Sequence, residues 1–70
     1  MNVLIARYTT ESAVHEIVRR EGGYFARTYF ANPESEMPLT VREAGERVDM
    51  MRRGGGQVFA PLGESLKVER

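Results

Sequence analysis

The side chains that most often carry out catalysis are sparse in this chain of 70 residues. It has a single histidine, His15, a single aspartate, Asp49, and no cysteine. Ser12 precedes His15 by about one helical turn, but a serine nucleophile also needs a group that orients its histidine base, and none is evident. The sequence therefore predicts no catalytic residues and a protein that is not an enzyme.

The residues that could bind a metal or a phosphate do not have the spacing that such sites need. Zinc is usually held by four protein ligands, or by three and a water, and the lone histidine and scattered glutamates do not supply them. The glycines at 54–56 follow a predicted helix, whereas a phosphate-binding loop must precede one so that its free N–H groups face the anion. We expect no metal and no cofactor.

A second kind of chemistry, binding by aromatic and arginine side chains, has better support. The aromatic run at 24–30 predicts a strand in which Phe25, Arg27 and Tyr29 share one face. If Tyr24, Ala26 and Phe30 on the other face pack on helices, this trio points outward. Such a trio fits a protein-binding hot spot, where Tyr and Arg are enriched, and it also fits the stacking of unpaired bases.

The element predicted most firmly is a helix over 41–53. Thr40 and Glu43 have the spacing of a capping box, and the glycines at 54–56 end the helix. Its apolar stripe is formed by Val41, Ala44, Gly45, Val48 and Met51. Met50 falls on the opposite side, so the surface formed by Arg47, Met50 and Arg53 is the second candidate for partner binding.

The remaining segments are predicted less uniformly. A strand over 3–8 is apolar on both faces, and a short strand covers 57–60. The segment 9–23 is read preferably as a helix capped by Thr10, because in a strand Glu16 would share a face with Val14 and Val18; a hairpin strand over 14–20 stays open as the alternative. Residues 32–38 read as an acidic loop with two prolines, and 66–68 as a short strand or a tail.

These elements predict one small α+β domain over residues 1–70. We expect a sheet of three or four strands with one or two helices packed on one face. Ten basic and ten acidic side chains leave no net charge, which disfavours a dedicated nucleic-acid binder. No apolar run is long enough to cross a bilayer, and the lack of cysteine fits the cytoplasm.

By elimination, we expect a small non-enzymatic module that docks onto a larger protein as an inhibitor, adaptor or regulator. Its general profile resembles that of small inhibitors encoded by phages and mobile elements, which is an analogy of class. Two alternatives stay open. One is a single-stranded nucleic-acid binder that uses the aromatic and arginine strand face, and the other is a homodimeric structural module.

Overall fold

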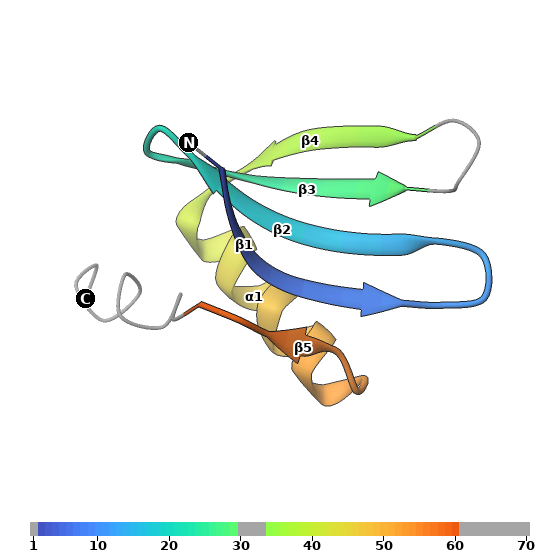
Figure 1. Ribbon diagram of the computed structural model, residues 1–70. Coiled ribbons are helices and arrows are strands. Elements are labelled where there is room, and N and C mark those ends of the chain that lie inside the picture. The colour runs from blue at the N-terminus through green and yellow to red at the C-terminus, as the bar shows by residue number, and fades with distance from the viewer. Residues whose placement is uncertain (1, 30–33, 61–70) are drawn as a thin grey trace.

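The fold is a five-stranded antiparallel sheet with one helix packed across one face, in a computed structural model that describes residues 2–29 and 34–60 (Figure 1). The strands lie in the order β4-β3-β2-β1-β5, so that α1 connects the two edges of the sheet. The elements are β1 (Asn2–Thr9), β2 (Val14–Arg20), β3 (Gly23–Tyr29), β4 (Ser35–Leu39), α1 (Val41–Arg53) and β5 (Gln57–Val58).

The core lies between α1 and the sheet. It is formed by Ile5, Ala6, Ile17, Tyr24, Leu39, Ala44 and Val48. The predicted helix is confirmed with its bounds: Thr40 Oγ1 accepts from the N–H of Glu43, and the Glu43 carboxylate accepts from the N–H of Thr40. Val41 and Met51 pack against this core, so the predicted apolar stripe faces the sheet.

A β-bulge in β1 changes which side chains face the helix. The pairing with β2 shifts between Leu4 and Ala6, and Ile5 is the extra residue. As a result Ile5 and Ala6, which follow each other in sequence, are both buried in the core. Residues after a bulge change face relative to an unbroken strand. Arg7 is therefore directed to the face of the sheet opposite α1, where it lies across from Glu16.

The preferred helix over 9–23 is wrong, because this segment forms a turn and then β2. Thr10 Oγ1 accepts from the N–H of Ala13 at 3.1 Å, which closes a local turn and does not cap a helix. Glu21 and Gly22 have φ of 40° and 83°, the positive values that a two-residue hairpin turn requires. The hairpin strand over 14–20, the alternative that the β-branched content of the segment favoured, is the structure that forms.

Two further segments differ from the prediction. The supposed loop at 32–38 contains most of β4, an edge strand in which Pro38 pairs with Phe25. A proline is tolerated in such a strand because its missing N–H can face outward, where it also hinders the addition of another strand. The predicted strand over 57–60 is confined to β5, while Phe59 and Ala60 donate their N–H groups to the Ile5 carbonyl.

The predicted α+β class is confirmed, but the count of elements is not. Among residues 2–29 and 34–60 there are five strands and one helix, in place of three or four strands with up to two helices. The prediction at 66–68 lies outside the described residues.

Candidate functional site: the open face of the sheet

The face of the sheet opposite α1, here called the open face, carries side chains in rows that run across the strands. Residues directly opposite each other in paired strands point to the same side. One row, the charged row, alternates in sign across four strands and consists of Arg7, Glu16, Arg27 and Glu36. The neighbouring apolar row consists of Leu4, Val18, Phe25 and Pro38.

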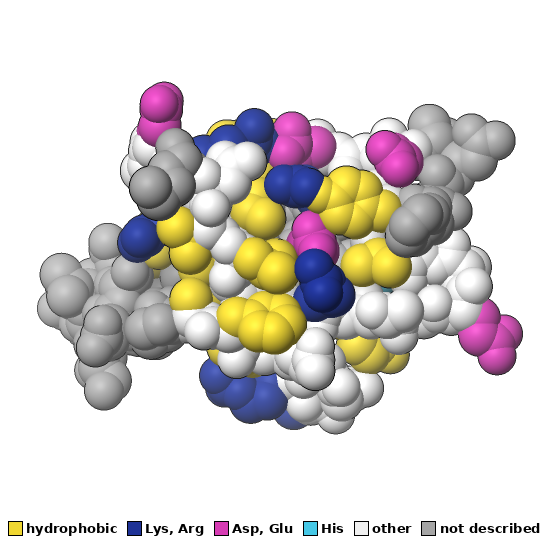
Figure 2. All heavy atoms as spheres, viewed as in Figure 1, with side chains coloured by type: hydrophobic (Ala, Val, Ile, Leu, Met, Phe, Trp, Pro, Cys, Tyr) yellow, Lys and Arg dark blue, Asp and Glu magenta, His cyan; other side chains and the backbone are white. Residues whose placement is uncertain are grey.

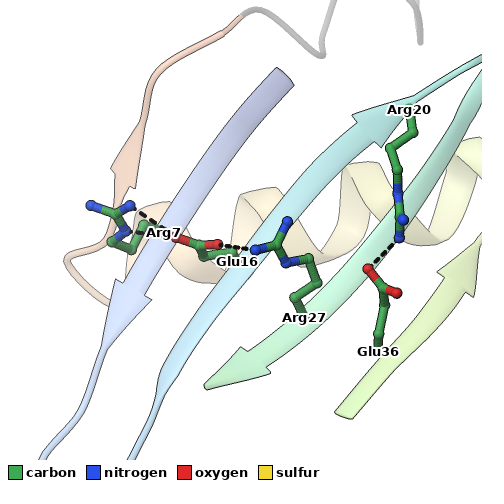
Figure 3. A network of polar contacts seen from close by, with 5 residues as sticks. All are labelled: Arg7, Glu16, Arg20, Arg27 and Glu36. Carbon is green, nitrogen blue, oxygen red and sulfur yellow. Dashed lines mark hydrogen bonds and ion pairs between the residues drawn. The ribbon is translucent and has the colours of Figure 1, made fainter. Parts of the chain in front are cut away.

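Glu16 stands at the centre of the charged row, between two guanidinium groups (Figure 3). Its Oε2 accepts a hydrogen bond from Nε of Arg7 at 2.9 Å and lies 2.9 Å from Nη2 of the same arginine, while its Oε1 lies 3.8 Å from Nη2 of Arg27. The residue is only 5% exposed, although no described element covers this face. A buried carboxylate is costly unless it is paired, so the two arginines make its position tolerable.

The other arginine of the face is held in a similar way. Arg20 pairs with Glu36 across β3, and its guanidinium carbon lies 4.2 Å from the centre of the Phe25 ring. Arg27 stands over Tyr29 at 4.7 Å, and Arg7 lies 5.8 Å from the centre of the Phe59 ring. Each arginine therefore has both an acidic and an aromatic neighbour, which restricts its rotamers before any ligand arrives.

The surface that results is mixed on a fine scale. Figure 2, which has the same viewpoint as Figure 1, shows hydrophobic side chains interleaved with single basic and acidic ones over the strands. Phe59 is 51% exposed at one side of this surface, and Phe25 and Tyr29 are half-buried. Apolar contact area and charged groups are thus both available to a ligand.

The predicted trio of Phe25, Arg27 and Tyr29 lies together on the open face. Its counterparts Tyr24 and Ala26 face α1, as the alternation predicts, and Phe30 lies outside the described residues. Sequence reasoning missed the other charged and aromatic members of the face, which are Arg7, Glu16, Arg20, Glu36 and Phe59. The sequence signal for Glu16 was its position between Val14 and Val18 on one face of a strand. This position was interpreted only as evidence against a strand.

The second candidate surface lies on the other side of the molecule. Arg47 and Met50 line a groove of about 660 Å³ between α1 and the ends of β1 and β2. Tyr8, His15, Glu43, Glu46, Met51 and Gly54 complete its lining. Arg53 does not line this groove and pairs with Asp49 on the exposed side of α1. The six predicted partner-binding residues therefore fall into separate sites.

In the groove, His15 contacts side chains of both neighbouring strands. Its ring stacks on Tyr8 with 6.4 Å between centroids, and Nδ1 lies 3.4 Å from the hydroxyl of Thr28. Within residues 2–29 and 34–60, no three His, Asp or Glu side chains are placed to share a metal ion. The helix of this described part is too short and too polar to cross a bilayer.

Comparison of the chain with protein-family models, with curated proteins and with solved structures finds no match.

Proposed function

We propose that this protein is a non-enzymatic binding module that docks its open face onto a larger protein, as an inhibitor, adaptor or regulator. One observation carries the proposal: the sheet face opposite α1 is left uncovered by the elements of residues 2–29 and 34–60, yet it holds Phe25, Arg27 and Tyr29 side by side. Tyr and Arg are among the residues that contribute most to protein interfaces.

The side chains of the open face are ordered in advance of binding. Arg20 stacks on Phe25, Arg27 stacks on Tyr29, and Glu16 fixes Arg7. Immobilising a flexible side chain on binding costs about 0.5–1.5 kcal/mol. Because contacts within the free protein already hold these side chains, less conformational freedom is lost when the face binds. This favours high affinity for a rigid surface.

The chemistry of the face also defines the partner. Its apolar row and the exposed Phe59 need apolar side chains to cover them. Three arginines stand against two glutamates in its ion pairs, which leaves one positive charge in excess. The partner that fits is a protein surface with an apolar centre and a small number of carboxylates.

The same geometry gives less support to single-stranded nucleic acid as the ligand. A base would stack on an exposed aromatic ring, but guanidinium groups already stand over Phe25 and Tyr29. All three arginines of the face are also paired with carboxylates, Arg7 and Arg27 with Glu16 and Arg20 with Glu36. The groove on the other side remains the second candidate for a protein contact.

The test compares Phe25→Ala/Tyr29→Ala with the control Arg47→Ala/Met50→Ala, which alters the groove. Immobilised wild-type protein first captures proteins from a nuclease-treated lysate of the cells in which it occurs. Each captured protein is then purified and titrated against folded variants. We expect the open-face variant to lose at least about tenfold in affinity, since two hot-spot residues are truncated, while the control binds as the wild type does.

Three outcomes would contradict the proposal. The first is equal affinity of the wild type and the folded open-face variant, and the second is loss of affinity in the groove variant alone. The third is a wild-type dimer in sedimentation that Phe25→Ala/Tyr29→Ala dissociates, because the occupant of the face would then be a second copy of the chain.

A further inference from the structure

A surface that binds its partner only through arginines does not need a buried carboxylate such as Glu16. Among the described residues it is the charged residue that is buried, at 5% exposure, and it lies between Arg7 and Arg27 in the charged row. A buried ion pair often stabilises a protein no better than apolar residues of the same volume. Stability alone therefore does not account for a carboxylate at this position.

Without the Glu16 charge, the open face would resemble a platform for single-stranded nucleic acid. Arg7, Arg20 and Arg27 come from three successive strands, and each has an aromatic neighbour. Nonspecific binding of nucleic acid needs a basic surface of this kind along the phosphate backbone. Its free energy comes from counterions that basic side chains release from phosphates, and a guanidinium already neutralised by a carboxylate contributes little.

We infer that Glu16 is a specificity-determining residue, an internal counter-ion that keeps the open face from binding polyanions. It fixes Arg7 but leaves the Arg7 side chain 43% exposed, so that this arginine can still meet a single carboxylate of a protein partner. Specificity of this kind depends on making the wrong ligand unfavourable as well as on contacts with the right one. The inference rests on the proposed function of the same face.

The decisive variant is Glu16→Gln, which keeps the size and the acceptor oxygen of the side chain and removes its charge. The probe is a fluorescent single-stranded oligonucleotide of mixed sequence, titrated at ~50 and ~150 mM salt, where binding through phosphates weakens steeply. We expect the variant to bind about three- to tenfold more tightly than the wild type at the lower salt, because one net positive charge is exposed on the face.

The matched control is Glu46→Gln in the groove, which raises the net charge of the molecule by the same amount. It should bind the probe as weakly as the wild type does. The double variant Glu16→Gln/Arg7→Gln restores the charge of the open face and should also return to wild-type binding. If Glu16→Gln gains no affinity, or if Glu46→Gln gains as much, the inference is wrong.

Folding of each variant is checked by circular dichroism and thermal unfolding. If Glu16→Gln does not fold, Glu36→Gln decides, because it frees Arg20 at the exposed edge of the same face. A gain in oligonucleotide affinity there supports the inference, and no gain overturns it. This probe does not involve the protein partner, so failure here leaves the test of the proposed function unaffected. Tight wild-type binding at the higher salt would overturn both.

Discussion

At the scale of single residues, the strands that form the open face depend on a close approach between two backbone segments. Gly56 lies between α1 and β5, where the chain passes close to β1. A Cβ built there would stand 2.8 Å from the Arg7 carbonyl oxygen and 2.9 Å from that of Met51. Both neighbours are backbone atoms, so neither can rotate away. The absence of a side chain at Gly56 thus allows β5 to pair beside Arg7.

We predict that Gly56→Ala destabilises the fold by about 1–3 kcal/mol, the usual cost of overpacking. The free energy of unfolding in urea measures this effect. Gly54→Ala is the control, because its Cβ would meet the Tyr8 ring, whose side chain can shift, at 3.3 Å. Equal stability of Gly56→Ala and the wild type would show that β5 does not approach β1 as closely as described.

At the scale of elements, the capping box sets where α1 begins. Thr40 and Glu43 exchange hydrogen bonds of 3.1 and 2.8 Å between side chain and backbone. We predict that Thr40→Ala lowers the free energy of unfolding by about 1 kcal/mol, because an N–H group of the first turn loses its acceptor. Arg42→Ala, an exposed change in the same turn, should have little effect. A Thr40→Ala protein as stable as Arg42→Ala would contradict this account of the cap.

The bulge in β1 links the core to the open face. Ile5 and Ala6 both face α1, and Arg7 then lies opposite Glu16. We predict that deletion of Ile5 keeps Arg7 opposite Glu16, because Leu4, Ala6 and Arg7 then alternate in an unbroken strand, but destabilises the fold by about 2–5 kcal/mol, because the core loses the Ile5 side chain. Ile5→Val keeps the bulge and should cost about 0.5–1.5 kcal/mol. Thermal unfolding separates the two, and a deletion variant that melts with Ile5→Val would show that the bulge is dispensable.

The elements differ in how far the sequence alone predicts them. α1 was predictable because its cap, apolar stripe and glycine end all agree. β2 was not, because Glu16 between Val14 and Val18 breaks the alternation of a strand, and its partners Arg7 and Arg27 come from other strands. β4 was hidden by Pro38, which is compatible with an edge strand once the strand order is known.

The candidate site was predictable only within one strand. Alternation in β3 is enough to group Phe25, Arg27 and Tyr29. Arg7 could not be added, because the face of a residue after a bulge cannot be derived from periodicity. Glu16 and Arg20 belong to the site only if their segment is a strand, which the sequence left open. The other members of the site come together only through the pairing of strands, which is a long-range property that local patterns do not predict.

At the scale of the whole molecule, the charges balance in total, and those in the ion pairs of the open face cancel to within one positive charge. The chain has no net charge, and the arginines of the open face stand next to carboxylates. Long-range attraction to a partner is therefore weak, and affinity must come from contacts made after the surfaces meet.

This balance predicts how binding responds to salt. The dissociation constant for the protein partner should change less than about tenfold between ~50 and ~200 mM salt, because apolar contacts and short-range pairs are screened little. Titration calorimetry at several salt concentrations measures the change. A loss of affinity of about a thousandfold would instead indicate a polyanionic ligand.

The central claim is that the partner covers the open face and leaves the helix side free, and hydroxyl-radical footprinting of the wild-type complex tests it most directly. The molecule carries suitable reporters on both sides: Phe59 is 51% exposed beside Arg7, while Met50 is 66% and Met37 44% exposed. Met50 lines the groove, and Met37 lies opposite Ala26 on the side of the sheet that α1 covers. We predict that the partner lowers labelling of Phe25, Tyr29 and Phe59 and leaves both methionines unchanged. Protection of Met50 with full labelling of Phe59 would contradict the claim.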